Sequence, residues 1–304
     1  MKKSTKVWLV IAVLCIVIGA VMFTVALSME GFDFMELTTK KIEINNYKVG
    51  DTVDKIYIDT DAADIDFYTY RESEIRVECT ETDKIKYDVC VEDSTLKIEV
   101  KDDRKWYDYI GFNFTRMLIK VYLPGGVEYS SVVINTTTGD VNVPEQIYTD
   151  TLDVKVTTGD IKCYARINES LKLKTTTGDI ELKNTDCNGD VEVKVSTGKM
   201  IMTDINCRSI TCSGTTGDVE MKNVTAAEKL TLNRTTGDIL LEGVDANELD
   251  ITATTGYIKG TLLTEKDFIA KTTTGKIEVP KTAGGKCKLS TTTGDIIIDI
   301  VPSA

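Results

Sequence analysis

Apolar and polar residues alternate along most of the chain after residue 40, and from about residue 130 the alternation has a fixed period. A Thr-Thr-Gly-Asp-like motif recurs every 19 or 20 residues. Its glycines are Gly139, Gly159, Gly178, Gly198, Gly217, Gly237, Gly256, Gly275 and Gly294. A period of this length is typical of proteins in which each repeat forms one turn of a coil.

Alignment of the repeats on this glycine gives four positions that are apolar in nearly every repeat. They lie seven and five residues before the glycine and two and four residues after it, as at Leu171, Leu173, Ile180 and Leu182. The positions between them are mostly polar, which is the period-2 pattern of a strand with one buried face. We therefore predict an all-β fold: a β-solenoid (parallel β-helix) of about nine to ten coils of 19–20 residues. Each coil is expected to run strand, corner, strand and return loop.

The region before the regular array carries a weaker version of the same pattern. Residues 55–67 match the repeat if Ala63 takes the place of the glycine. From there to residue 130 several segments alternate like strands without the fixed period. We predict an irregular β cap region over residues 41–130, including this degenerate coil, and regular solenoid repeats over residues 131–304.

The first residues have neither alternation nor repeats. Val7–Leu27 is a run of 21 residues without a charge, long enough to cross a bilayer as a helix. Lysines precede the run and acidic residues follow it, which favours a cytoplasmic N-terminus. We predict a cytoplasmic segment (1–6), a transmembrane helix (7–28) that contacts the lipid bilayer, and a juxtamembrane linker (29–40). The alternative is a cleaved signal peptide with its site near Ala26-Leu27-Ser28.

The composition narrows the possible chemistry. The 304 residues include no His, and 36 Lys plus Arg stand against 48 Asp plus Glu. Histidine-dependent triads and His-ligated metals are excluded, and a nucleic acid is not expected as a partner. Carbohydrate-active β-helix enzymes carry clusters of charged residues, and the nearest analogue here is Arg234. It is the only charged residue at its position in the aligned repeats and is interpreted as surface charge. We predict no catalytic residues, no metal site and no cofactor.

Six of the nine motif glycines are followed by aspartate: Asp140, Asp160, Asp179, Asp218, Asp238 and Asp295. Calcium sites need six to eight oxygen ligands, and one aspartate per coil supplies too few. Lysine at two of the other positions also interrupts the column. We interpret these aspartates as caps of the turns rather than as metal ligands.

Two further groups of residues are candidates for specific roles. Cys187 and Cys207 lie nine residues after their glycines in consecutive coils, close enough for a possible disulfide. A dense group of aromatic residues is a candidate binding patch for a sugar or a membrane interface, or alternatively covers the first coil. This group consists of Trp106, Tyr107, Tyr109, Phe112 and Phe114.

The last strand expected from the pattern, residues 296–301, is followed only by Pro302-Ser303-Ala304. An uncovered final coil would present unpaired backbone groups. We therefore expect possible self-association, or docking of a partner, at a C-terminal open coil.

The segment Ile119–Tyr129 (IKVYLPGGVEY), the N-terminal apolar run and the Thr-Thr-Thr-Gly-Asp-Val repeats together resemble the bacterial putative-adhesin β-solenoid family of unknown function. The resemblance covers roughly residues 40–301. It implies an envelope protein held to the membrane, and it supplies no catalytic residues.

The expected function is that of a membrane-anchored, extracytoplasmic binding, adhesion or scaffold module of the bacterial cell envelope, with an envelope protein or a glycan as partner. The expected location is the cell membrane, crossed once, with the C-terminal domain outside. One alternative is a sensor or regulator of envelope stress. Another is a carbohydrate-active β-helix enzyme.

Overall fold

A computed structural model describes residues 3–29, 42–50, 52–104 and 116–301 of the chain. It contains one helix, α1 (Lys3–Met29), followed by strands only. In the first part these are β1 (Glu43–Val49), β2 (Lys55–Ala62), β3 (Asp64–Tyr70), β4 (Ile75–Glu81), β5 (Ile85–Glu92), β6 (Thr95–Asp102), β7 (Leu118–Pro124), β8 (Glu128–Thr138), β9 (Val141–Val143), β10 (Tyr148–Thr158) and β11 (Ile161–Cys163). They continue with β12 (Arg166–Thr177), β13 (Ile180–Thr197), β14 (Met200–Thr216), β15 (Val219–Thr236), β16 (Ile239–Thr255), β17 (Ile258–Leu262), β18 (Lys266–Thr274), β19 (Ile277–Glu278), β20 (Gly285–Thr293) and β21 (Ile296–Ile300).

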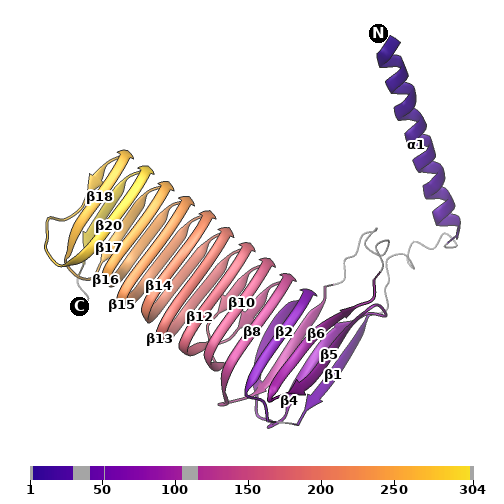
Figure 1. Cartoon of the computed structure of the whole chain (residues 1–304), viewed down its shortest axis with the longest axis horizontal. Coiled ribbons are helices and arrows are strands. Elements are labelled where there is room, and N and C mark those ends of the chain that lie inside the picture. The colour runs from indigo at the N-terminus through magenta and orange to yellow at the C-terminus, as the bar shows by residue number, and fades with distance from the viewer. Residues whose placement is uncertain (1–2, 30–41, 51, 105–115, 302–304) are drawn as a thin grey trace.

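The strands stack in parallel to form a β-solenoid, as predicted (Figure 1). Strands β8, β10, β12, β13, β14, β15 and β16 pair in this order along the rod. Equivalent residues face each other, so that Thr177 lies opposite Thr197 and Thr197 opposite Thr216. The solenoid has about eight turns, slightly fewer than the nine to ten predicted. The terminal turn is incomplete, since β19 has only two residues, whereas the sequence count gave every glycine corner a full turn.

The four predicted apolar columns fill the inside of the rod and belong to one continuous hydrophobic core. The turn of β14 shows that the core has a further part. Besides Met200, Met202, Ile210 and Cys212, this turn buries Ile205 and Cys207, which lie in the segment expected to be a return loop. The prediction of a loop was wrong because the return segment also alternates and forms a third strand segment.

Each motif glycine is required by its neighbour in the stack. All nine have φ between +118° and +150°, a conformation that favours glycine. At Gly198 a Cβ atom would lie 2.0 Å from the carbonyl oxygen of Gly178. The predicted conformational reason for the glycine is confirmed, and the stacking adds a second, steric one.

A second corner follows six residues after the glycine. Asn184, Asp204, Asn223 and Gly243 occupy it in four consecutive turns, with φ between +51° and +62°. Asn, Asp and Gly are the residues that tolerate this left-handed conformation. Asn184 and Asp204 also line the groove described below.

The N-terminal end of the rod combines parallel and antiparallel pairing. Ile56 and Ile58 of β2 lie opposite Val132 and Ile134 of β8, and β2 also pairs with β6. Beyond this turn, β4 and β5 run antiparallel to β7 and β6, and β1 adds an antiparallel edge to β4. Residues far apart in sequence thus close this end of the core.

The last two turns are exchanged relative to their order in the chain. Strand β20 lies between β16 and β18, and β21 lies between β17 and β19, as Figure 1 shows at the yellow end of the rod. The prediction of an open C-terminal coil was wrong in its location, because the final strand is paired on both sides. The outer edge is formed by β18 and β19, where Ile269 is 53% and Ile277 is 42% exposed.

The buried side chain of Lys266 bridges the exchanged turns. From the outer strand β18 it reaches across Gly285 of β20 and donates to the carbonyl of Ala246 (2.7 Å). Its ammonium group also lies 2.6 Å from the Asp245 carboxylate. Glycine at position 285 fits the close stacking of the turns, since a Cβ there would lie 2.5 Å from the carbonyl oxygen of Asn247.

The apolar N-terminal run lies within helix α1. Among the residues that the structure describes, no helix combines the length and the apolar character needed to cross a membrane. The transmembrane helix over residues 7–28 stays a prediction.

Candidate binding groove

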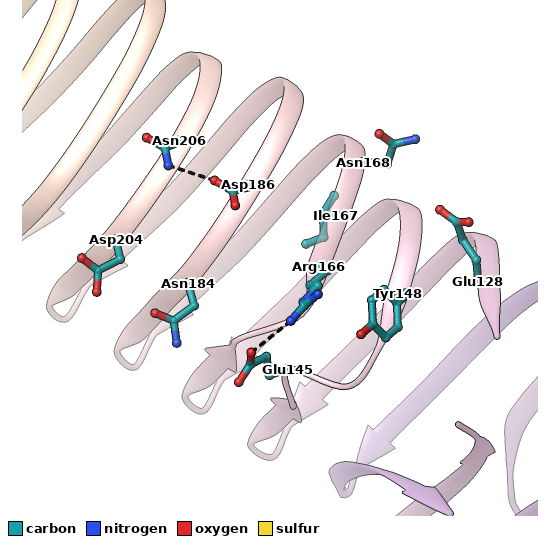
Figure 2. A pocket seen from close by; sticks show the side chains of 10 residues that line it. All are labelled: Glu128, Glu145, Tyr148, Arg166, Ile167, Asn168, Asn184, Asp186, Asp204 and Asn206. Atoms are coloured by element: carbon teal, nitrogen blue, oxygen red, sulfur yellow. Dashed lines mark hydrogen bonds and ion pairs between the residues drawn. The ribbon is translucent and has the colours of Figure 1, made fainter. Parts of the chain in front are cut away.

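An open groove of about 660 Å³ lies across several turns near the middle of the rod (Figure 2). Its floor and walls come from the starts of β8, β10 and β12 and from the second corners of β13 and β14. The lining residues are Glu128, Glu145, Tyr148, Arg166, Ile167, Asn168, Asn184, Asp186, Asp204 and Asn206. Except for Ile167, these side chains are polar or amphipathic.

One end of the groove combines an ion pair with an aromatic ring. Arg166 lies 3.4 Å from the carboxylate of Glu145, and its guanidinium carbon lies 5.3 Å from the centre of the Tyr148 ring. Tyr148 is half-buried and stands at the start of β10, one turn away from Arg166. An aromatic face next to charged donors and acceptors suits a ligand with both apolar and hydroxyl-bearing surfaces.

The other part of the groove is a series of amide and carboxylate side chains linked from turn to turn. Asn206 donates through Nδ2 to Asp186 (2.9 Å), as Figure 2 shows. Asn168, also in the lining, donates to Asp150 (3.0 Å) and accepts from Asn188 (2.7 Å), two residues outside the lining of the groove. These bonds hold the side chains in fixed positions, so that their remaining donors and acceptors are pre-organised for a polar ligand.

Sequence reasoning did not identify this groove. The sequence signal was the Asn or Asp at the second corner, six residues after the motif glycine, together with the polar residues two positions later. The groove needs both the left-handed corner and the stacking of turns, and the second of these is a tertiary feature.

The aspartates after the motif glycines are caps, as predicted, and the cap acts between turns. Asp160 accepts a hydrogen bond through Oδ1 from the backbone N–H of Asp179 (2.8 Å), and Asp179 accepts one from that of Lys199 (2.7 Å). The other four aspartates of the column make the same kind of bond to an adjacent turn. Among the described residues, no three metal-ligating side chains converge on a common point.

The interpretation of Arg234 as surface charge was wrong. Its side chain is 3% exposed and enters the space left by Gly214 in the adjacent turn. It donates hydrogen bonds to four backbone carbonyls, those of Val195 (3.0 Å), Gly198, Thr216 (2.9 Å) and Gly217 (2.6 Å). Burial lowers the pKa of Arg234, while the charge of Asp218 opposes this effect. The guanidinium therefore has a structural role across three turns.

Cys187 and Cys207 face each other in adjacent turns. Both are buried free thiols in the structure, and the disulfide between them stays a prediction. Burial raises the pKa of Cys207 to about 12, so its thiol is protonated at neutral pH and is a poor nucleophile there. The aromatic candidate patch Trp106, Tyr107, Tyr109, Phe112 and Phe114 lies outside the described residues.

Comparison with known proteins assigns the chain to a family. The family model described as Toastrack DUF4097 matches residues 53–189 and again residues 184–304, which together make up most of the chain. This chain belongs to the Toastrack DUF4097 family. The resemblance that the repeats indicated is confirmed. The two matched ranges of this Toastrack chain meet within the solenoid, near residue 189. A comparison with curated proteins finds no match.

One solved structure supports the same fold, and a second is also similar to this chain. A putative adhesin from Parabacteroides distasonis ATCC 8503 is 14% identical, with a TM-score of 0.51 over 83% of this chain and 98% of that chain. A putative adhesin from Bacteroides fragilis NCTC 9343 is 16% identical, with a TM-score of 0.49 over 86% of this chain and 98% of that chain. At these identities the likeness of the Toastrack chain to them concerns the fold alone.

Proposed function

We propose that this chain is a non-catalytic binding module of the bacterial cell envelope, anchored in the membrane by residues 7–27, with the solenoid outside the cell. The observation that carries the proposal is the open groove lined by Asn and Asp side chains with Tyr148 at one end, because it continues over several turns and suits an extended polar ligand. A glycan is the ligand class that matches it best, since sugar hydroxyls pair with amides and carboxylates and sugar faces stack on an aromatic ring.

The solved protein from Parabacteroides distasonis, which is described as a putative adhesin and has a similar fold, supports a binding role. The membrane part of the proposal is supported by the sequence, in which 21 uncharged residues follow three lysines. It is also supported by α1, which exposes large apolar side chains such as Trp8, Leu14, Ile16 and Phe23. Such side chains are stable where lipid replaces water.

Binding can be tested with the purified full-length chain on an array of immobilised oligosaccharides. The variant Tyr148→Ala/Asn168→Ala/Asn206→Ala removes groove side chains, and we expect it to lose binding. The matched control Asn142→Ala/Asn233→Ala removes two amides from other columns and should bind as the unchanged protein does. Equal binding by the groove variant, or no binding of any glycan by the unchanged protein, contradicts the proposed ligand class.

Anchoring can be tested by fractionating cells that express the full-length chain. We expect the chain in the membrane pellet, and we expect protease added to intact cells to digest its solenoid. Ile16→Lys with Val13→Lys places two charges in the apolar run and should release the chain from the membrane. A wild-type chain found in the soluble fraction, or one protected from external protease, contradicts the proposed topology.

A further inference from the structure

Several charged side chains on the outside of the solenoid pair with opposite charges in adjacent turns. Lys222 lies 2.6 Å from Glu242, and Lys229 lies 3.1 Å from Glu248. Arg208 pairs with Asp190 in the same way (2.8 Å). Stacked opposite charges stabilise neighbouring strands, whereas like charges directly opposite each other destabilise them.

One exposed column of lysines lacks this arrangement. Lys155, Lys174 and Lys194 lie directly opposite one another in three consecutive turns, and all three are exposed. With strands about 4.8 Å apart, three ammonium groups are held in a row along the rod. We call these three residues the lysine stripe.

The stripe has few compensating charges. Lys155 has one carboxylate near it, that of Asp153 at 3.5 Å. Within the described part of the chain no ion pair involves Lys174 or Lys194, and none involves Lys172 beside them. The aspartate column also stacks like charges, but each of its carboxylates accepts a backbone N–H from an adjacent turn. The stripe has no such structural reason for its repulsion.

The surface is hollowed on both sides of the stripe. A hollow of about 270 Å³ is lined by Lys172, Lys174 and Lys194 together with Asp153 and Glu192. On the other side a hollow of about 290 Å³ brings Lys155 and Lys174 next to threonine hydroxyls, among them Thr137 and Thr176, and its lining also includes the carboxylates of Asp59 and Asp61. An anionic group placed in either hollow would meet ammonium groups and, on the second side, hydroxyl donors as well.

We propose that the lysine stripe binds a linear polyanion whose phosphate groups run along the rod axis. The repulsion between stacked ammonium groups is relieved when anions lie between them, and a polymer supplies several anions at once. The chain as a whole has 12 more acidic than basic residues, so attraction of a polyanion is confined to this local patch. The inference rests on the proposed role as a binding module, but it concerns a different surface from the glycan groove.

The test uses the purified full-length chain and inorganic polyphosphate as the probe, at low and at high salt. Lys155→Gln/Lys174→Gln/Lys194→Gln is expected to weaken binding about tenfold, because each exposed ion pair contributes about a factor of two. Binding to the unchanged protein should weaken with added salt. The matched control Lys199→Gln/Lys222→Gln/Lys229→Gln removes the same charge from paired lysines and should stay within about twofold of the unchanged protein.

A second measurement separates binding from folding. Lys174→Glu turns the stripe into a Lys-Glu-Lys ladder, which should leave the urea midpoint equal or higher while polyphosphate binding is lost. The groove variant Tyr148→Ala/Asn168→Ala/Asn206→Ala should bind polyphosphate normally, so that failure of the groove and failure of the stripe are distinguishable.

Four results would overturn the inference. One is unchanged binding by the stripe variants, and another is an equal loss in the control variant. The third is competition by monomeric inorganic phosphate at the same concentration of phosphate groups, which would indicate a single-anion site. The fourth is binding to vesicles with anionic lipid headgroups that polyphosphate does not displace, which would indicate a lipid surface instead.

Discussion

The carboxylate of Asp295 accepts a hydrogen bond from the backbone N–H of Lys276 at 3.0 Å, although Lys276 comes one repeat earlier in the chain. In the other turns the aspartate caps the turn that follows in sequence. The bond therefore reflects the exchanged order of the last two turns. In sequential order Lys276 would follow Tyr257, and position 295 would follow Lys276. The caps of these two turns would then have to come from the side chains of Tyr257 and Lys276, and neither has a carboxylate. The exchange therefore gains one cap.

The exchanged order can be checked by pairing cysteines. Thr252 and Ser290 face each other in β16 and β20, so Thr252→Cys/Ser290→Cys should form a disulfide under mild oxidation. The control Thr252→Cys/Lys271→Cys joins positions that would be neighbours in sequential order. In the structure they are two turns apart, about 9.6 Å, which is beyond disulfide range. Mass spectrometry of digested protein would show the opposite pairing if the order were sequential.

Removal of one aspartate cap should destabilise the solenoid modestly. In Asp160→Ala the backbone N–H of Asp179 loses its acceptor, and we expect the free energy of unfolding to fall by about 1 kcal/mol. Asp160→Asn keeps an oxygen at the same place and serves as the control, expected close to the unchanged protein. Urea unfolding followed by circular dichroism measures both, and equal midpoints for all three proteins would contradict the capping role.

The buried Arg234 gives a graded prediction. Arg234→Ala leaves four backbone carbonyls without this donor, and we expect a loss of about 3 kcal/mol. Thr175 bonds the carbonyl of Gly159 in the turn before it (3.0 Å) from the equivalent position. Arg234→Thr should therefore recover one bond, to Gly217, and fall between the other two proteins in stability.

That order of urea midpoints, with Ala lowest and Thr intermediate, is the expected result. An Arg234→Ala protein as stable as the unchanged one would show that the four carbonyls find other partners. Gly214→Ala provides a further check, because its Cβ would lie 1.8 Å from a guanidinium nitrogen of Arg234. It should be destabilising in the presence of Arg234 and somewhat less so with Thr at position 234, where the new Cβ would still lie 2.0 Å from the carbonyl oxygen of Val195.

Buried thiols make the solenoid sensitive to alkaline pH. Burial raises the pKa of Cys163 from 9.0 to about 12. Below pH 9 the thiol is protonated in both states, so its contribution to stability is fully present. Between pH 9 and 12 the unfolded chain ionises first, and stability is lost as the pH rises. We expect about 1 kcal/mol of loss from this residue between pH 8 and pH 10.

Cys163→Val isolates this effect, since valine already occupies the equivalent position in β9 at Val143. At pH 8 the variant should be within about 1 kcal/mol of the unchanged protein. Between pH 8 and pH 10 the stability of the variant relative to the unchanged protein should increase by about 1 kcal/mol. A difference between the two proteins that stays constant from pH 8 to pH 10 would contradict the raised pKa.

The sequence by itself determined the architecture of this protein. The period of 19 or 20 residues, the four apolar columns and the glycine at each corner are local, repeated features. They predict a solenoid because backbone conformation and the burial of one strand face are encoded residue by residue. The capping role of the aspartates was also predictable, since each follows a glycine at a bend.

Some features depend on which turns lie next to each other, and these were decided by the tertiary structure alone. The exchange of the last turns places Lys266 against Asp245 across Gly285, and no local pattern encodes this order. Arg234 is buried because the glycine opposite it, in the neighbouring turn, leaves room. The groove and the lysine stripe likewise exist only when turns are stacked, because residues about 20 positions apart become neighbours about 4.8 Å apart.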